Sequence, residues 1–530
     1  SAVAGHARGL PGVVHAEENV YTCSQDAQDA MAETIRREGL NRVVVAACSP
    51  STHEPLFQAT LASAGVDPHL VDMANIRNQC SWAHQAEPGR ATEKAKDLVR
   101  ASVARVRELE PLGGGTFEVP ATALVLGGGV AGMAAAIALA PHAEVTLVER
   151  GDGLGGRSVE LTTTFPDGEP GAEIAGRLER AVRDAGVKVL TGTQLVSVDG
   201  YVGAFSYTLE GPGGQPEEGL ASVMILAVGA DTYEPAEGEF GWGAPSVQTN
   251  LQLEGDLERP PRGESIAFIQ CVGSRDQEHG CSRYCCQATL QQATELARAG
   301  NRVNVLYRDV RAYAAAGEDA YTRAREAGVL FTRYDPDHPP EVSQDGRTVR
   351  FRDELALRTV ETGVDRVVLA VGLRPSTTTA AVRAMLRLPE DAEGFLLERH
   401  PKLGPVETNT EGIYLAGSCQ APMNITESAT GGAAAAMKAM VPLGKGWVAM
   451  GTNTSEVNEE TCIGCGLCIS LCPYHAISKT EDNKAQVNQA LCEGCGLCAA
   501  SCPTRSISVR HFRDNQLRAQ VHALVGGDAE

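Results

Sequence analysis

The chain has 530 residues, of which 43% are hydrophobic and 21% charged, the composition of a soluble protein with several domains. Its formal net charge is −21. This charge argues against binding to nucleic-acid backbones or anionic membranes, because both need a basic surface. Sixteen cysteines are present, and eight of them lie between Cys462 and Cys502. The clustering indicates free thiols or bound metal in a reducing compartment, so we expect a cytoplasmic location.

The apolar pattern predicts strands that alternate with helices, which is typical of parallel α/β sheets. A buried strand at 40–47 and an amphipathic helix at 91–109 come first. Further strands are expected at 123–126, 144–148, 221–228, 265–269, 302–307 and 366–371, and helices at 288–299 and 432–440. The uncharged stretch 121–141 contains four glycines and fits a strand, a turn and a helix, so no transmembrane segment is expected.

A glycine triplet, Gly127-x-Gly129-x-x-Gly132, follows a predicted strand and opens a helix, and Glu149 ends the next strand. Such glycines permit a tight turn and the close approach of a pyrophosphate to the helix N-terminus, while the acid accepts hydrogen bonds from a ribose. The triplet therefore predicts a dinucleotide site, with a generic Rossmann turn as the alternative.

Two later segments favour FAD over NAD as this dinucleotide. The loop GLGGR at 153–157 and the pattern T-x3-GIYLAG before Ser418 resemble the flavin-binding segments of the two-dinucleotide disulfide reductases, although that family usually has Asp where Ser418 stands. The predicted FAD-binding residues are Gly127, Gly129, Val130, Ala131, Gly132, Glu149, Arg150, Gly155, Gly156, Arg157, Gly229, Gly417 and Ser418.

The second Rossmann unit lacks the glycine triplet that would bind a pyridine nucleotide. After the strand at 265–269 the chain instead carries four cysteines in the spacing C-x9-C-x3-C-C, namely Cys271, Cys281, Cys285 and Cys286. The spacing favours a metal cluster, and a group of buried thiols or a redox pair that acts on substrate are the alternatives. Arg275 and Arg283 lie among these cysteines, where they either stabilise the charge of a reduced cluster or remain solvated.

Two cysteine runs that start 30 residues apart give the strongest signal. Each reads C-x2-C-x2-C-x3-C-P, the pattern of bacterial ferredoxins with two [4Fe–4S] clusters, in which the fourth cysteine of each run binds the other cluster. The predicted ligands are Cys462, Cys465, Cys468 and Cys502 for one cluster, and Cys492, Cys495, Cys498 and Cys472 for the other. Zinc sites and disulfides are alternatives that fit eight cysteines in two such runs poorly.

Four stretches of sequence resemble HdrA, the flavin-containing component of heterodisulfide reductase, and its bacterial relatives. They are LNRVVVAACSPSTHEPLF, MANIRNQCSWAH, IQCVGSR with the following CSRYCC, and NVLYRDVRAY. The similarity runs over essentially the whole chain. It implies an electron-transfer subunit that contains FAD and iron–sulfur clusters, with a [4Fe–4S] cluster on Cys271, Cys281, Cys285 and Cys286.

The resemblance also implies a cluster in the N-terminal domain, where Cys23, Cys48 and Cys80 match family cysteines. Three cysteines do not complete a [4Fe–4S] site. Because the chain begins at Ser1 without Met, we expect it to be processed or truncated and further ligands to lie upstream. The sequence therefore leaves undecided whether the chain holds a fourth cluster.

The resemblance further implies partners, which are the other subunits of a multi-subunit complex, soluble ferredoxin, and a homo-oligomer within the complex. Flavin-bifurcating members of the family carry a lysine shortly after the paired cysteines, whereas this chain has Gln291 at that place. The sequence therefore leaves undecided whether the chain performs flavin-based bifurcation. Two alternatives remain. One is an NAD(P)H-dependent flavin oxidoreductase fused to a ferredoxin domain, like the small subunit of glutamate synthase, and the other is a scaffold with structural clusters.

The expected fold is α/β, with a thioredoxin-reductase-like tandem Rossmann core that binds FAD. An N-terminal α/β domain and a C-terminal bacterial two-[4Fe–4S] ferredoxin domain flank this core. The expected segments are the N-terminal domain at 1–112, the first part of the FAD domain at 113–262, a degenerate nucleotide-binding-like domain with the inserted cluster at 263–375, the return of the FAD domain at 376–450, and the ferredoxin domain at 451–530. No catalytic residue is expected, because the protein holds and tunes redox centres.

Overall fold

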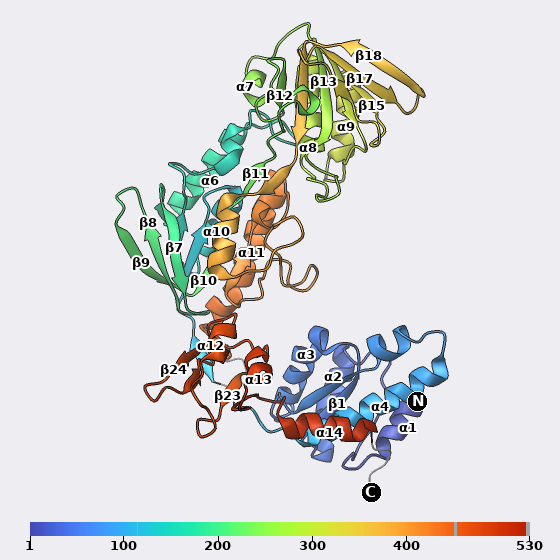
Figure 1. Cartoon of the computed structure of the whole chain (residues 1–530), viewed down its shortest axis with the longest axis vertical. Helices are drawn as coiled ribbons and strands as arrows, with labels where there is room; N and C mark the ends of the chain where they lie inside the picture. Colours follow the sequence, from blue (N-terminus) through green and yellow to red (C-terminus); the bar gives the residue numbers. More distant parts are fainter. Residues whose placement is uncertain (114, 450–452, 526–530) are drawn as a thin grey trace. The chain divides into compact units, whose positions relative to one another are not determined.

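The structure, a computed structural model, describes residues 1–113, 115–449 and 453–525 (Figure 1). Residues 1–116 and 449–530 group into a first compact unit, and residues 117–448 form a second. The chain passes between the units at β3 (Thr116–Glu118) and β22 (Trp447–Ala449). The expected boundary between residues 450 and 451 lies outside the described residues, and the division into five segments stays a prediction.

The glycine-rich half of the second unit is built on a five-stranded parallel sheet in the order β21-β10-β4-β5-β6. Its strands are β4 (Thr122–Leu126), β5 (Glu144–Val148), β6 (Lys188–Leu190), β10 (Val223–Leu226) and β21 (Ile413–Leu415). β4 and β10 lie inside the sheet because their runs are apolar on both faces, as parallel strands require. The strand order reverses between β4 and β10, and open α/β sheets bind ligands beyond the carboxyl ends of their strands at such a point.

Helices α5 (Val130–Leu139) and α11 (Ile425–Lys445) pack against each other beside this sheet. Their contact is rich in alanine and glycine, which lets the two backbones approach closely. The remaining elements of this half are η2 (Gly156–Glu160), α6 (Gly171–Asp184), α10 (Thr377–Leu386), η4 (Gly417–Cys419), and an antiparallel sheet of β7 (Gln194–Asp199), β8 (Phe205–Glu210) and β9 (Pro216–Ala221).

The cysteine-bearing half has a second five-stranded parallel sheet, in the order β12-β19-β13-β14-β15. Its strands are β12 (Val247–Thr249), β13 (Ser265–Val272), β14 (Arg302–Tyr307), β15 (Leu330–Arg333) and β19 (Arg366–Val371). Other elements are η3 (Glu239–Gly241), α7 (Glu254–Leu257), α8 (Cys285–Arg298), α9 (Gly317–Glu326), and an antiparallel sheet of β16 (Glu341–Val342), β17 (Thr348–Asp353) and β18 (Arg358–Gly363). Two short antiparallel strands, β11 (Ala230–Thr232) and β20 (Leu373–Pro375), connect the two halves (Figure 1).

The predicted strands at 144–148, 302–307 and 366–371 are confirmed with the same bounds. The strand predicted at 265–269 is confirmed and runs on to Val272, so that it carries Cys271 at its end. The helix predicted at 432–440 is the middle of the longer α11, whose N-terminal turn the apolar pattern did not reveal.

The first unit combines both ends of the chain. Its N-terminal part contains α1 (Ala2–Arg8), α2 (Gln25–Glu38), the parallel pair β1 (Val43–Ala47) and β2 (Val71–Asn75), α3 (Pro50–Ser63), η1 (Arg77–Trp82) and α4 (Pro88–Arg107). Its C-terminal part contains β23 (Ser455–Val457), α12 (Leu467–Leu471), β24 (Ile477–Lys479), β25 (Ala485–Val487), α13 (Leu497–Ser501), β26 (Ile507–Val509) and α14 (Asp514–Val525). Helix α14 packs against α4, and Gln516 donates a hydrogen bond to the Glu108 carbonyl at 3.1 Å.

Candidate functional site

A cavity of about 610 Å³ lies at the carboxyl ends of β4 and β10 in the second unit, where the strand order reverses. All but two of the predicted FAD-binding residues line it. The two exceptions are Gly132 and Gly417, which contribute to packing instead. A Cβ at Gly132 would lie 1.8 Å from the Gly127 carbonyl oxygen, and one at Gly417 would lie 2.7 Å from the Ala131 Cβ.

The glycine turn leaves a cradle for a ligand at the start of α5. Gly127 has a φ of +104°, and a Cβ there would lie 2.2 Å from the Ala227 carbonyl oxygen, so only glycine fits. A Cβ at Gly129 would meet nothing within 4 Å, which means that this position opens toward the cavity. Gly129 is the N-cap of α5 and has no side chain to satisfy the helix N–H groups, so these groups are available to a pyrophosphate.

The Glu149 carboxylate lies at the edge of this cradle. It accepts hydrogen bonds from the backbone N–H of Gly128 and of Gly151, each at 2.6 Å. An ionised carboxylate has about four lone-pair sites, so acceptor capacity remains for the hydroxyls of a ribose. The next residue, Arg150, donates to the Thr378 hydroxyl on α10 at 2.6 Å.

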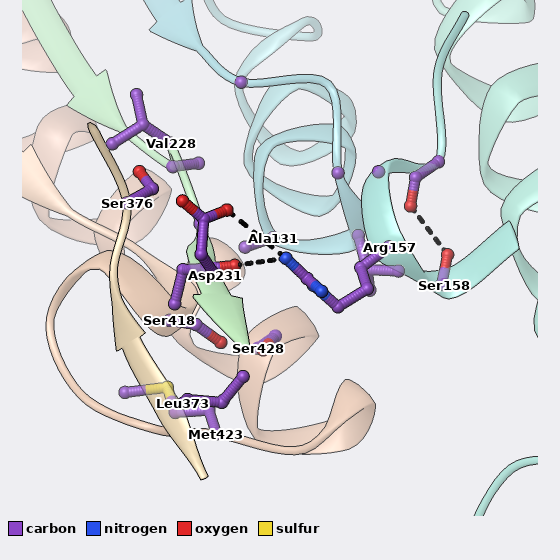
Figure 2. Close-up of a pocket in the computed structure, with 18 of the residues that line it drawn as sticks. Ala131, Arg157, Ser158, Val228, Asp231, Leu373, Ser376, Ser418, Met423 and Ser428 are labelled. Carbon is purple, nitrogen blue, oxygen red and sulfur yellow. Dashed lines mark hydrogen bonds and ion pairs between the residues drawn. The ribbon is translucent and has the colours of Figure 1, made fainter. Parts of the chain in front are cut away.

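Arg157 reaches across the cavity from η2 to strand β11, as Figure 2 shows. Its Nη2 donates to the Ala230 carbonyl at 2.9 Å and forms an ion pair with Asp231 at 3.4 Å. Gly155 and Gly156 before it both have positive φ, which places η2 against the glycine turn. Ser418 lines the cavity beside Ser428 of α11.

The far end of the cavity is formed by residues that the sequence did not single out. Asn250, Glu254, Tyr284 and Gln287 line it from the cysteine-bearing half. Glu254 is 2% exposed and accepts hydrogen bonds from the Gln292 amide at 2.5 Å and the Thr162 N–H at 2.8 Å. Burial raises the pKa of this carboxyl. Tyr284 and Gln287 flank Cys285 and Cys286 in the chain, which was the one available signal for them, whereas nothing in the sequence marks Asn250 or Glu254.

The cysteines of this half converge at the end of β13 and the first turn of α8. Cys271, Cys285 and Cys286 are buried, and Cys281 is half-buried. Burial and the neighbouring Cys286 raise the pKa of Cys271 to about 11. A hydrogen bond between the paired thiols raises the pKa of Cys285 and lowers that of Cys286 to about 7. All four thiols therefore lie close enough to interact electrostatically.

The loop around these thiols has features that fit a bound iron–sulfur cluster. Cys271, Arg275 and Arg283 all have positive φ although none is glycine, so strain is concentrated there, as is common at functional sites. Ser274 Oγ and Arg275 Nη1 are buried without a hydrogen-bond partner among the described residues. A buried donor left unpaired costs about 1–3 kcal/mol, and a bound cluster with acceptor sulfurs would remove that cost.

The two C-terminal cysteine runs surround two hollows in the first unit. One is lined by Cys462, Cys465, Cys468 and Cys502, and the other by Cys492, Cys495, Cys498 and Cys472. The backbone N–H of Ser455, Ala476 and Ser506 donates to Cys492, Cys472 and Cys502 at 3.3–3.4 Å. Within the described ranges no three His, Cys, Asp or Glu side chains converge on one metal ion. The four thiols of each set line one hollow, and four cysteine thiolates are the ligands that a [4Fe–4S] cluster takes.

The N-terminal cysteines are placed differently. Cys80 is buried, Cys48 is half-buried and Cys23 is exposed. Burial raises the pKa of Cys80, and the charge of Lys94 opposes this shift. No interaction joins the three thiols in the part of the chain that the structure describes, and a cluster on them stays a prediction. No helix in the described residues is both long and apolar enough to cross a membrane.

Comparison with known proteins relates the glycine-turn region and the C-terminal cysteine runs to known families. A family model described as a 4Fe–4S dicluster domain matches residues 455–509, and one described as pyridine nucleotide-disulphide oxidoreductase matches residues 106–267. Among solved structures, the chain is similar to thioredoxin reductase from Lactococcus lactis, with 21% identity and a TM-score of 0.45 over 61% of this chain and 99% of that chain.

Two curated relatives extend over nearly the whole chain. The chain is 37% identical to the second A-type iron–sulfur subunit of the CoB–CoM heterodisulfide reductase of Methanopyrus kandleri, over 90% of this chain and 88% of that protein. It is 36% identical to the A-type subunit of the H2:CoB-CoM heterodisulfide,ferredoxin reductase of Methanothermobacter thermautotrophicus, over 100% of this chain and 95% of that protein. The predicted fold class is confirmed, and the cofactors of the chain are FAD and [4Fe–4S] clusters.

Proposed function

The chain belongs to the HdrA family of heterodisulfide reductase subunits, oxidoreductase components that transfer electrons, and from this premise we propose which residues hold its redox centres. FAD lies in the cavity at the carboxyl ends of β4 and β10. One [4Fe–4S] cluster is held by Cys271, Cys281, Cys285 and Cys286, and two more by the eight C-terminal cysteines. Bound there, FAD exchanges electrons in pairs and each cluster exchanges them singly.

One observation carries this proposal. The first turn of α8 bears Cys285 and Cys286, and the next residues on the same turn, Gln287 and Ala288, line the cavity. The cysteine site and the dinucleotide site therefore share one rigid element. Short separation between the two centres then follows from the helix itself, without movement of either half.

The surrounding residues hold the two halves together at this point. Asn424 at the start of α11 donates to the Gln287 side-chain oxygen at 2.8 Å. Glu427 of the same helix accepts from Arg283 at 2.7 Å and from the Tyr313 hydroxyl at 3.2 Å. These contacts position the cysteine loop against the N-terminus of α11, which lines the cavity.

Other parts of the proposal rest on the relatives. We place the chain in a multi-subunit complex in the cytoplasm, as a homo-oligomer within that complex, with ferredoxin as an exchange partner at the C-terminal domain. Reduction by NAD(P)H is disfavoured because β13 ends in Cys271 where a pyridine-nucleotide domain needs its glycine turn. Bifurcation is not part of the proposal, since the described cavity lining contains no lysine and Gln291 lies against Gly168 outside it.

The test is the metal and flavin content of cysteine variants purified without oxygen. Cys285→Ala is expected to lose about four irons and to keep FAD. Cys465→Ala should lose about four irons from a different, C-terminal cluster. Cys419→Ala is the matched control, because Cys419 is a buried thiol whose hydrogen bonds go to the Leu226 and Ala416 carbonyls. Full iron content in Cys285→Ala would mean that these are packing thiols and would refute the assignment.

A further inference from the structure

Arg275 is held in a fixed position beside the cysteines of the second unit. Its φ of +58° is unusual for a residue with a side chain. The loop closes around it because its N–H donates to the Gly280 carbonyl at 2.9 Å, while its own carbonyl accepts from Arg308 Nη1 at 2.7 Å. Hydrogen bonds therefore hold both the N–H and the carbonyl of Arg275, and they fix the position of its Cα and the direction of its side chain.

The guanidinium of Arg275 has one half committed and one half free. Nη2 donates to Asp309 at 2.8 Å in an ion pair. Nη1 is buried and has no hydrogen-bond partner among the described residues. Asp309 also contacts the cysteine set, because its backbone carbonyl accepts a hydrogen bond from the Cys286 thiol at 3.9 Å. Through Asp309, a charged donor without a hydrogen-bond partner among the described residues therefore lies beside the cysteine set.

Arg283, the other arginine in the loop, is engaged elsewhere. Its Nη2 donates to Glu427 and its Nε to the Tyr313 hydroxyl, and its guanidinium stacks over the Tyr313 ring at 5.1 Å. Its backbone N–H donates to the Cys281 thiol at 3.4 Å. The sequence left both arginines as candidates for stabilising a reduced cluster, and the structure separates them.

We propose that the free Nη1–H of Arg275 donates a charge-assisted hydrogen bond to a sulfur of the cluster held by Cys271, Cys281, Cys285 and Cys286, and thereby raises its reduction potential. This inference rests on the proposed function. Adding one electron to a four-thiolate cluster increases its negative charge by one, with no bond made or broken. The guanidinium stays protonated in both states, so no proton moves. A fixed cation beside the sulfur stabilises the more negative state more strongly.

Three variants of the full chain test this assignment in a redox titration with dithionite, monitored by electron paramagnetic resonance. Arg275→Gln removes the positive charge and the branched guanidinium donors, and Arg275→Lys keeps the charge without those branched donors. Arg333→Gln is the matched control, because Arg333 also pairs with Asp309, at 3.7 Å, but belongs to β15 and has Glu354 as a second partner at 3.1 Å. The signal of the relevant cluster is the one absent from Cys285→Ala.

Arg275→Gln is expected to keep its iron and FAD and to shift the reduction equilibrium of this cluster at least tenfold toward the oxidised form, which is about 59 mV for one electron. Arg275→Lys should fall between Arg275→Gln and the unaltered protein, and Arg333→Gln should match the latter. If Arg275→Gln loses iron, Arg275→Lys decides. An unshifted potential in either Arg275 variant that keeps its iron overturns the inference. If Cys285→Ala loses neither iron nor a signal, the proposed function fails instead.

Discussion

At the level of single residues, the Glu149 carboxylate connects the sequence motif to the cavity. It fixes the glycine turn through Gly128 and the following loop through Gly151, so it shapes the site before any ligand binds. The same oxygens face the position at which a Rossmann fold binds a ribose. A substitution of Glu149 should therefore lower the affinity for the dinucleotide and also loosen the two loops that Glu149 holds.

We expect Glu149→Ala to bind FAD about ten- to a hundredfold more weakly, because a charge-assisted hydrogen bond contributes about 1.5–3 kcal/mol. Fluorescence titration of the flavin-free protein with FAD measures this, and the iron content should stay unchanged. Glu144→Ala is the control, since Glu144 is an exposed acid at the other end of β5. Equal FAD affinity in Glu149→Ala and Glu144→Ala would place the dinucleotide elsewhere.

Among the secondary-structure elements, α11 is the helix on which both halves of the second unit meet. Its N-terminus carries a capping box, in which Asn424 accepts from the Glu427 N–H at 2.8 Å and Glu427 accepts from the Asn424 N–H at 3.1 Å. This bond fixes the Asn424 oxygen toward the helix, so its amide nitrogen is free to donate to Gln287. Local capping therefore orients a contact between two segments that are far apart in sequence.

Asn424→Ala should lower the free energy of unfolding by about 0.5–2 kcal/mol from the lost cap alone. Losing the Gln287 contact adds to that, so the upper part of the range is expected. Urea denaturation followed by circular dichroism measures the change. Thr430→Ala serves as the comparison, because Thr430 is exposed on the same helix and its hydroxyl donates to the Thr426 carbonyl. A cost no larger than that of Thr430→Ala would show that the cap does not stabilise this junction.

Across the full chain, the two ends meet in one unit through polar contacts. Arg105 of α4 forms an ion pair with Asp72 and donates to the His511 carbonyl at 2.8 Å. The His511 ring is buried and donates to the Glu110 carbonyl at 2.8 Å, with His69 at 6.5 Å between ring centroids. The Asp67 carboxylate hydrogen-bonds to the His69 ring, and its charge favours the protonated form of His511.

This junction should weaken in mild acid. Burial lowers the pKa of His511 below 6.5, with further lowering from His69 and Arg105, while the Glu110 carbonyl and Asp67 oppose the shift. The unfolded chain then binds a proton more readily than the folded one. The contribution is fully present above pH 6.5 and is lost as the pH falls through the folded pKa, by about 1.4 kcal/mol per unit of pKa separation.

Differential scanning calorimetry at about pH 7.5 and about pH 5.5, on either side of the ordinary histidine pKa, measures this loss. The His511→Gln variant keeps a donor for the Glu110 carbonyl and should lose less stability between the two pH values than the unaltered chain. His522→Gln, at an exposed position on α14, should behave like the unaltered chain. An identical pH dependence in His511→Gln would contradict the assignment to His511.

The amino-acid sequence alone was enough for the features that neighbouring residues encode. The glycine turn, the strands at 144–148, 302–307 and 366–371, and the two ferredoxin runs all depend on local spacing, because backbone conformation and ligand loops are set within a few residues. The cavity lining followed from the same patterns at the dinucleotide end, where the turn itself makes the site.

Which distant side chains complete the site was settled by the tertiary fold. Glu254 and Asn250 belong to no motif, and they reach the cavity because β11 and β20 bring the second half beside the first. Arg275 and Arg283 are equivalent in the sequence. In the structure Arg283 is committed to Glu427, whereas Arg275, which pairs with Asp309, retains a buried Nη1 without a hydrogen-bond partner among the described residues. Burial and partner choice depend on packing between segments that lie far apart along the chain, and no local pattern encodes that packing.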